Sequence, residues 1–265
     1  MEPALYTVDA FTGRPFSGNP AAVCLLPGPR ADSWMRLLAR EMNLSETAFV
    51  HPVEGGFSLR WWTPKVEVQL CGHATLAAAC VLWDTGILGP AEAARFQTLS
   101  GWLTCRQEGD WIAMDFPARP AAPCETPAGL SEALGCEVLA TGCNGMDYLV
   151  EVREAQTVRG LAPDFGALSK LPVRGVIVTS LSDSPDWDFV SRFFAPAVGV
   201  NEDPVTGSAH CALGPYWASR LGRAEFTAHQ ASERGGVVKV TLEGERVWLR
   251  GQAVLMSEVR LKCWD

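Results

Sequence analysis

The sequence predicts an α+β fold built twice, as two similar domains that are each a curled, mostly antiparallel sheet around a central apolar helix. An internal repeat carries this prediction. Residues 57–64 (FSLRWWTP) recur 132 positions later as residues 189–196 (FVSRFFAP). Two similar turns, residues 71–74 (CGHA) and 206–209 (TGSA), lie 135 positions apart, and each one opens an apolar helix.

A chain of 265 residues has room for two ordinary domains. We place the first at 1–117 and the second at 118–265, because residues 116–123 (FPARPAAP) form a proline-rich linker. The last strand of a duplicated fold can cross back onto the first domain, and the sequence does not decide this. Unlike polar residues at two matching turns predict one asymmetric site in a cleft between the domains.

Composition and charge narrow the class of protein. With 30 acidic against 22 basic residues and a net charge of −8, the chain lacks the basic face that nucleic acid requires. Residues 1–6 (MEPALY) show no signal peptide, and no run reaches the roughly 18 apolar residues of a membrane helix. Nine scattered cysteines without a CxxC pair indicate a reducing compartment, with most thiols in the core. We therefore expect a cytoplasmic protein with no membrane or nucleic-acid partner.

The first half begins with two predicted strands, 5–10 and 20–26, followed by a helix that runs to about Asn43. Asp32 or Ser33 is expected to cap this helix, and its residues at helical spacing leave an apolar stripe on one face. A short strand follows at 48–50. The expected stripe consists of Trp34, Leu37, Leu38, Glu41 and Met42.

The two central helices are predicted at 73–83 and 208–220. The first is apolar all round but too short for a bilayer, so protein must surround it. Gly86 and Gly222 are expected to end the two helices. The second contains Pro215, which removes one backbone hydrogen bond and costs about 3 kcal/mol if nothing compensates. The sequence offers no explanation for its tolerance.

The helix starts at the two turns are candidate anion sites. The first turn of a helix presents unpaired backbone amides and a partial positive charge. Glycine at 72 and at 207 allows a ligand to approach the backbone closely. If the repeat brings the two starts face to face, they form an anion-binding cleft with little need for basic side chains. The alternative is that both turns are ordinary helix caps.

Three side chains near these turns have both a structural and a catalytic interpretation. His73 at a helix start should be neutral, and it either caps its own helix or exchanges a hydrogen bond with a substrate. Asp203 either caps its loop through an Asx-type bond or orients a catalytic group. Glu46 lies between a predicted helix and a predicted strand. A carboxylate in such a connection is usually solvated, so its position and residue type alone do not predict a catalytic role.

Cys71 is a competing candidate. A thiol beside a helix start has a lowered pKa and can act as a base or nucleophile. A racemase with two cysteines is disfavoured because Thr206 stands at the equivalent position. A metal centre is not predicted, since the four histidines show no ligand spacing, and no nucleotide-binding loop is present.

Three motifs together resemble one family. Residues 41–49 (EMNLSETAF), 71–77 (CGHATLA) and 202–210 (EDPVTGSAH) are similar to the PhzF (phenazine biosynthesis) family, on the branch with the phenazine biosynthesis-like domain protein, also called MAWD-binding protein. The opening DAF and GNPAAV segments agree, so the likeness runs nearly end to end. The resemblance implies the diaminopimelate-epimerase-like fold, with the site between two domains.

The resemblance also implies a cofactor-free isomerase without a metal. In PhzF a glutamate moves a proton between two carbons of a cyclohexadiene amino acid, and this role falls on Glu46. His73 and Asp203 would be the other catalytic residues, and Ser208 would bind the substrate. Gly72 and Gly207 would hold the substrate carboxylate through their backbone. A homodimer is the assembly that the family suggests.

Several departures leave the substrate open. Cys71 stands where PhzF itself has an apolar or small residue, Trp61 and Trp62 are expected to crowd the cleft, and His210 and Cys211 follow the second turn. One alternative is an epimerase or dehydratase of an amino acid that depends on Cys71. Another is a non-catalytic binding protein of the MAWD-binding type. Retention of Glu46, His73, Asp203 and Ser208 together favours the isomerase.

Overall fold

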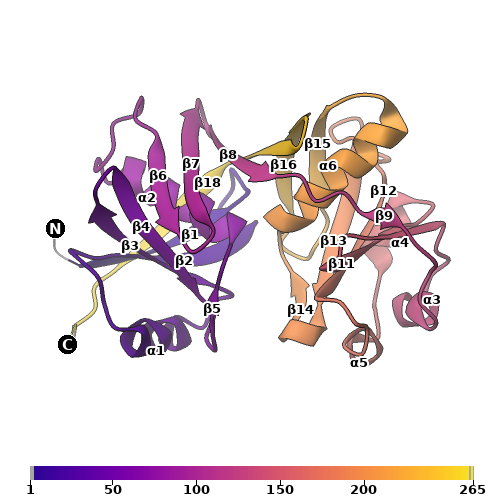
Figure 1. The fold of residues 1–265 in the computed structure, drawn as a ribbon, viewed down its shortest axis with the longest axis horizontal. Helices are drawn as coiled ribbons and strands as arrows, with labels where there is room; N and C mark the ends of the chain where they lie inside the picture. The colour runs from indigo at the N-terminus through magenta and orange to yellow at the C-terminus, as the bar shows by residue number, and fades with distance from the viewer. Residues whose placement is uncertain (1–2, 263, 265) are drawn as a thin grey trace. The chain divides into compact units, whose positions relative to one another are not determined.

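The computed structural model describes residues 3–262 and 264, and the chain divides into two compact units. The first comprises Met1–Asp115 with Arg250–Asp265, and the second comprises Phe116–Leu249. The predicted second domain, 118–265, was therefore too long at its end. The reason is that β18 (Ala253–Val259) pairs antiparallel with β1 (Ala4–Ala10) of the first unit, as Figure 1 shows in yellow beside indigo.

The first unit contains two helices and nine strands among its described residues. The bounds of its helices are α1 Asp32–Met42 and α2 Gly72–Asp84. Besides β1 and β18, its strands are β2 Asn19–Leu25, β3 Thr47–Val53, β4 Gly56–Trp62, β5 Glu67–Val68, β6 Ala94–Thr98, β7 Gly101–Glu108 and β8 Trp111–Pro117, whose last two residues fall in the second unit.

The second unit has a similar order of elements with additional short helices. Its helices are α3 Leu130–Leu134, α4 Ala155–Gly160, α5 Phe165–Leu168, the 3₁₀ helix η1 Pro196–Val198 and α6 Gly207–Leu221. Its strands are β9 Ala122–Pro123, β10 Ala140–Cys143, β11 Asp147–Glu151, β12 Gly175–Leu181, β13 Phe189–Ala195, β14 Val200–Asp203, β15 Glu225–Gln230, β16 Gly236–Glu243 and β17 Arg246–Gly251, which continues into the first unit.

Strand pairing repeats between the units as the sequence repeat predicts. In the first unit β1–β2 is antiparallel, β2–β3 parallel, β3–β4 antiparallel and β4–β6 parallel. In the second unit the same directions recur for β10–β11, β11–β12, β12–β13 and β13–β15. An ion pair recurs with the strands, since Arg60 binds Glu67 and Arg192 binds Glu202, each through two hydrogen bonds of 2.6 and 2.7 Å. The duplication therefore extends to side-chain contacts.

Helix α2 is buried on all sides, as its composition predicts. Its residues from His73 to Leu82 are all buried, and the helix contacts β1, β2, β3 and β18. Gly86 follows the helix with a left-handed φ of 71°, which explains the glycine at that position. The outer face of the same strands packs against α1, in a core cluster that includes Trp62, so Trp62 belongs to the core of the first unit.

One expectation for α1 was wrong and a second was correct only in part. Ala31, with an extended backbone, precedes the helix and no side chain caps it; Asp32 lies in the first turn and pairs with Arg60 at 2.8 Å. Leu37 is 57% exposed. Trp34, Leu38 and Met42 of the expected stripe do pack in the core cluster, whereas the fully buried positions follow i, i+3 and i+4 spacing from Met35. The buried residues of α1 are Met35, Leu38 and Ala39.

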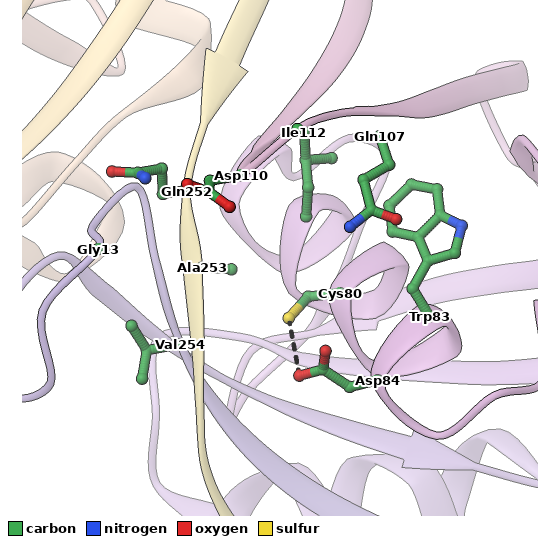
Figure 2. Close-up of a pocket in the computed structure, with 11 residues that line it drawn as sticks. Gly13, Cys80, Trp83, Asp84, Gln107, Asp110, Ile112, Gln252, Ala253 and Val254 are labelled. Carbon is green, nitrogen blue, oxygen red and sulfur yellow. Dashed lines mark hydrogen bonds between the residues drawn. The ribbon is translucent and has the colours of Figure 1, made fainter. Parts of the chain in front are cut away.

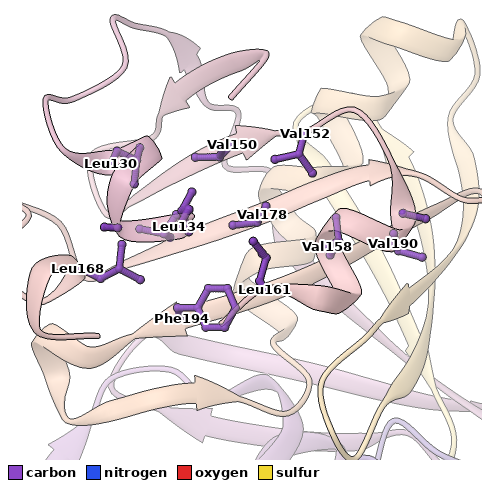
Figure 3. Close-up of a cluster of buried hydrophobic side chains, with 13 residues drawn as sticks. Leu130, Leu134, Val150, Val152, Val158, Leu161, Leu168, Val178, Val190 and Phe194 are labelled. Carbon is purple, nitrogen blue, oxygen red and sulfur yellow. The ribbon is translucent and has the colours of Figure 1, made fainter. Parts of the chain in front are cut away.

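Three short helices of the second unit, α3, α4 and α5, cover one face of β11, β12 and β13. Figure 3 shows this core, in which Leu134, Val158 and Leu168 of the helices meet Val178 and Phe194 of the strands. Neighbouring strand residues point to the opposite face. There Thr179 accepts a hydrogen bond of 3.1 Å from the Trp217 indole of α6, so α6 occupies the other side of the sheet.

The structure explains why α6 tolerates Pro215. A residue at 215 would normally donate its N–H to the carbonyl of Cys211, four positions earlier, and proline cannot. The backbone N–H of Arg119, in the linker, donates to this carbonyl at 2.9 Å instead. The linker therefore satisfies the acceptor that the proline leaves unpaired, which removes one part of the expected cost.

Replacing Arg119 with proline should cost about 1–3 kcal/mol of unfolding free energy, because the buried Cys211 carbonyl loses its donor. Arg119→Ala keeps the N–H and serves as the matched control. In a Pro215→Ala background the new N–H at 215 can take over the carbonyl, so the same substitution should cost less. Urea denaturation of the four variants tests this, and equal losses in both backgrounds would contradict it.

Buried thiols fit the expectation that most cysteines are core residues. Cys24, Cys80, Cys105 and Cys211 are all buried. Burial raises the pKa of the Cys24, Cys80 and Cys211 thiols to about 12, so they remain protonated at neutral pH. Over the described part of the chain, no helix has the length and apolar character required to cross a membrane.

Candidate active site

Glu46 lies in the connection from α1 to β3, one residue before the strand. Its backbone carbonyl accepts a hydrogen bond of 3.3 Å from the N–H of Ala22 in β2, which fixes the residue against the sheet. Asn43 ends α1 in the left-handed region, with φ of 50°, and turns the chain toward the strand. The Glu46 side chain is 18% exposed. A carboxylate expected to be solvated is therefore largely enclosed.

Glu46, Cys71 and His73 form one group of side chains in the first unit, called here the acidic cluster. The Oε2 atom of Glu46 lies 3.3 Å from Nε2 of His73. The Cys71 sulfur lies 3.5 Å from Nδ1 of the same imidazole. Ser45 approaches Nε2 with its hydroxyl at 3.4 Å. The imidazole therefore stands between a thiol and a carboxylate.

The start of α2 positions two members of the acidic cluster. Cys71 is the N-cap residue with an extended backbone, and the helix begins at Gly72. The carbonyl of Cys71 accepts hydrogen bonds from the N–H and the hydroxyl of Thr75, at 3.1 and 2.6 Å. Cys71 and His73 are 7% and 5% exposed. A rigid helix start therefore holds both side chains.

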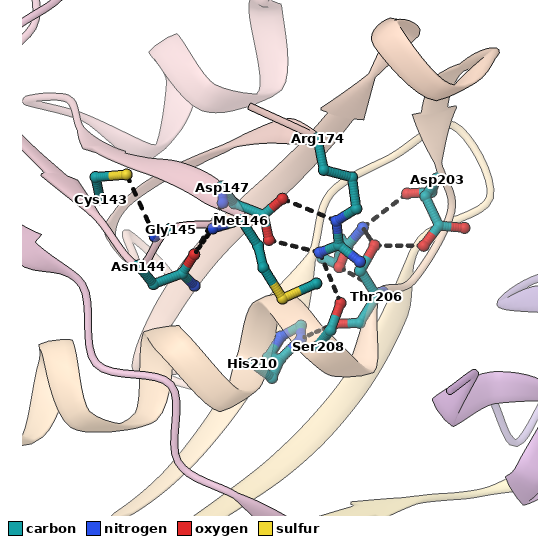
Figure 4. Close-up of polar contacts among 11 residues, drawn as sticks. Cys143, Asn144, Gly145, Met146, Asp147, Arg174, Asp203, Thr206, Ser208 and His210 are labelled. Atoms are coloured by element: carbon teal, nitrogen blue, oxygen red, sulfur yellow. Dashed lines mark hydrogen bonds and ion pairs between the residues drawn. The ribbon is translucent and has the colours of Figure 1, made fainter. Parts of the chain in front are cut away.

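In the second unit, Asp203 and Ser208 lie near the start of α6, as Figure 4 shows, and Gly207 is the first residue of that helix. The Thr206 hydroxyl donates to Oδ2 of Asp203 at 2.5 Å. Gln230 accepts from the Thr206 N–H at 2.8 Å and donates to the Asp203 carbonyl at 2.7 Å. Asp203 therefore contacts its own loop through the Thr206 hydroxyl, a side-chain bond that differs from the expected Asx-type bond to a backbone amide. Its neighbour Glu202 is engaged by Arg192.

A basic residue that the sequence did not reveal also lies at the start of α6. The Arg174 guanidinium donates to the Ser208 hydroxyl at 3.0 Å. Asp147, which is almost fully buried, binds the same guanidinium through two hydrogen bonds of 2.9 and 2.5 Å. The guanidinium also lies over the Phe193 ring, 5.1 Å from its centroid. The turn that was expected to need little help from basic side chains therefore has an arginine beside it, whose charge is paired with that of Asp147.

The sheet register shows which positions of the two units correspond. Thr47 pairs with Trp62, and Val176 pairs with Phe194, the repeat partner of Trp62. Thr47 and Val176 are therefore equivalent, and the residues two positions before them, Ser45 and Arg174, are equivalent as well. Ser45 contacts His73 and Arg174 contacts Ser208, which are themselves repeat partners. The same pair of positions is therefore in contact in both units, but the side chains at these positions differ.

By the same register Glu46 corresponds to Gly175. A Cβ atom at Gly175 would lie 2.6 Å from the Phe193 ring and 2.7 Å from the Phe194 carbonyl oxygen. No side chain fits there without movement of the backbone. The second unit therefore has no counterpart of the Glu46 carboxylate, and its charged group comes from the preceding residue, Arg174.

His210, which follows the second turn, is a buried structural residue. Its Nδ1 lies 2.8 Å from the Thr206 carbonyl oxygen and so donates to it. Its Nε2 is buried without a hydrogen-bond partner among the described residues. Burial lowers the pKa of His210 from its ordinary 6.5 to about 4. The imidazole is therefore neutral in the folded protein at neutral pH.

This shift predicts an acid sensitivity. The unfolded chain protonates this histidine near pH 6.5 and the folded chain only near pH 4, so stability is lost as pH falls through that window. Between pH 7 and pH 5 the loss should be about 2 kcal/mol from this residue. His210→Gln keeps a donor for Thr206 without titrating and should lose correspondingly less, as measured by urea denaturation at both pH values. Equal losses in the variant and the wild type would contradict this assignment.

A separate cavity of about 370 Å³ lies in the first unit. Figure 2 shows Cys80 donating to Asp84 at 3.6 Å on its wall, with Trp83, Asp110 and Gln252 nearby. None of the predicted site residues lines this cavity. It is therefore distinct from the acidic cluster.

Comparison with known proteins identifies the family. The family model described as phenazine biosynthesis-like protein matches residues 8–259, nearly the whole chain. The chain belongs to the PhzF family. A relative in Halalkalibacterium halodurans, named an uncharacterized isomerase, is 53% identical over 264 residues, covering 98% of this chain and 100% of that protein. The human phenazine biosynthesis-like domain-containing protein is 41% identical, covering 97% of this chain and 98% of that one.

Solved structures agree with this assignment. A PhzF family protein of Enterococcus faecalis superposes with a TM-score of 0.93 at 39% identity, covering 97% of this chain and 98% of that one. A probable proline racemase of Agrobacterium radiobacter shares the fold, with a TM-score of 0.66 at 13% identity, over 100% of this chain and 94% of that one. The predicted family and the predicted α+β, diaminopimelate-epimerase-like fold are confirmed. Two relatives that are each 53% identical to this chain are named uncharacterized isomerases, which indicates an isomerase-type enzyme.

Proposed function

We propose that this PhzF family member is a cofactor-independent isomerase that moves a proton on a small cyclic substrate with a carboxylate group. Glu46 acts as the single acid–base, taking a proton from one carbon and returning it to another on the same face. The observation that carries this proposal is the 3.3 Å contact between the enclosed Glu46 carboxylate and His73.

The acidic cluster suits proton transfer to and from carbon. Proton shuttling by a positioned side chain requires a group of fixed orientation near the substrate. Glu46 is held by its backbone bond to β2, and His73 by the start of α2. In our mechanism His73 donates a hydrogen bond that polarises the substrate while Glu46 moves the proton.

The second unit would bind the anionic part of the substrate. We propose that Ser208, the backbone at Gly207 and the Arg174 guanidinium hold the substrate carboxylate, and that Asp203 fixes the turn before Ser208 through its bond to Thr206. The backbone at Gly72, at the start of α2 in the first unit, is the corresponding candidate there. Nε and Nη2 of Arg174 already donate to Asp147 and Ser208, so Nη1 would supply the donor to the substrate carboxylate.

Deuterium exchange tests the proposal directly. Proton NMR in D₂O follows a panel of cyclic amino and carboxylic acids with wild type, Glu46→Gln and Cys71→Ser. Exchange with wild type and Cys71→Ser, but not with Glu46→Gln, supports the Glu46 mechanism and identifies the substrate class. Exchange that survives Glu46→Gln contradicts it.

One contact favours a second candidate function. Because the Cys71 sulfur lies 3.5 Å from Nδ1 of His73, the imidazole can accept the thiol proton. A Cys71-dependent epimerase or dehydratase of an amino acid would lose exchange in Cys71→Ser and keep it in Glu46→Gln. Absence of exchange across the panel with every protein would instead favour the binding-protein alternative.

A further inference from the structure

We propose that the acidic cluster is also a binding site for Zn²⁺, which coordinates Glu46, Cys71 and His73 and inhibits the enzyme by occupying its acid–base. The metal-binding part stands on the geometry of the three side chains alone. The inhibitory part rests on the function proposed above.

The donor set suits zinc. The three side chains offer one thiol sulfur, one imidazole nitrogen and one carboxylate oxygen, all within 4.8 Å of one another. Zn²⁺ binds this combination of soft and borderline donors, whereas Mg²⁺ and Ca²⁺ prefer oxygen alone. Three protein ligands and one open position form a common arrangement around zinc in enzymes.

The separations approach those of a tetrahedral site. Zinc bonds of about 2.3 Å to sulfur and about 2.0–2.2 Å to nitrogen and oxygen place S and N about 3.5 Å apart, and N and O about 3.4 Å apart. Here Nε2 of His73 lies 3.3 Å from Oε2 of Glu46 and 4.0 Å from the Cys71 sulfur. Because the sulfur lies nearer to Nδ1, at 3.5 Å, a zinc ion on Nε2 requires rotation of the imidazole or the thiol together with contraction of the sulfur–carboxylate separation, which is within 4.8 Å.

The local backbone favours such binding. Cys71 and His73 are held two residues apart at one helix start, and Glu46 is bonded to the sheet. Binding converts the Cys71 thiol to a thiolate, with the thiol proton released to solvent and the S–Zn bond formed in its place. The bound ion then occupies the carboxylate lone pair with which Glu46 would accept a substrate proton.

Calorimetric titration of the metal-stripped full chain with Zn²⁺ alone tests the binding. We expect one ion per chain in wild type. Cys71→Ser and Glu46→Gln should each weaken binding at least about 100-fold, because even outer-sphere partners of metal ligands cost about 10- to 100-fold. Cys124→Ser, which removes an exposed thiol of the second unit, is the matched control and should bind like wild type.

Cobalt provides a second readout that does not depend on affinity. Co²⁺ bound to wild type and to Cys124→Ser should show a thiolate-to-metal charge-transfer band, which Cys71→Ser should lack. Absence of one-to-one binding, or binding and a band unchanged by Cys71→Ser, would overturn the proposed site. If zinc binds but no compound in the panel exchanges deuterium, the proposed isomerase function is contradicted and the proposed zinc site is not. Exchange activity that zinc does not inhibit, despite binding, would overturn the inhibition.

Discussion

Replacing Glu46 with glutamine is expected to slow deuterium incorporation about 10²–10⁴-fold, the usual contribution of a positioned acid–base. Glutamine has nearly the same shape as glutamate and keeps the hydrogen-bonding oxygen, but it cannot hold a transferable proton. Because the Glu46 backbone is bonded to Ala22 in either case, thermal unfolding should change little.

Two controls isolate this effect. Glu41→Gln removes an exposed carboxylate at the end of α1, and it should exchange like wild type. Glu46→Asp keeps the acid but withdraws it by one methylene, so it should fall between wild type and glutamine. If Glu46→Asp is as slow as Glu46→Gln, the shorter aspartate side chain does not reach the substrate, and the mechanism stands. If Glu46→Gln exchanges as fast as wild type, the mechanism is wrong.

Replacing Arg174 with methionine is expected to cost about 3–5 kcal/mol of unfolding free energy. The loss arises because Asp147, whose side chain is 2% exposed, is left as an unpaired buried carboxylate. Replacing both partners, by Arg174→Met with Asp147→Leu, removes the unpaired charge and should recover most of this loss. Urea denaturation of the two single variants and the double variant measures the coupling.

The same double variant separates structure from function. If Arg174 binds the substrate carboxylate, the double variant should recover stability but not deuterium exchange, since Ser208 has lost its cationic neighbour. Arg174→Lys keeps the charge without the bidentate fork and should retain part of the exchange. Full recovery of exchange in the double variant would make Arg174 a structural residue only.

The architecture could be predicted because the repeat is strong where the core is most constrained. The apolar helix after Gly72 and its counterpart after Gly207 lie within about one residue of their predicted starts. Composition determines these elements, because a helix that is apolar all round has to be buried. Which face of α1 is buried was harder to predict. Leu37 and Met35 are both apolar, and only the packing of the helix against β3 and β4 determines that Met35 is buried and Leu37 is exposed.

The site was only partly predictable because its contacts are not local. Arg174 precedes Ser208 by 34 residues, and the parallel pairing of β11 with β12 brings its partner Asp147 alongside. No local spacing encodes this arrangement. Cys71 and His73 were visible as neighbours, but Glu46 joins them only through the fold of the first unit. The crossing of β18 onto β1 likewise depends on pairing between the two ends of the chain.

The correspondence of Ser45 with Arg174, and of Glu46 with Gly175, explains an advantage of having both copies in one polypeptide. An assembly of two identical half-length chains must carry the same residue at both equivalent places, so a carboxylate gained in one copy appears in the other. Fusion removes this constraint. Gly175, where no side chain fits, shows how far the second copy has diverged from the first. Each half has therefore become free to change its residues without imposing the same change on the other half.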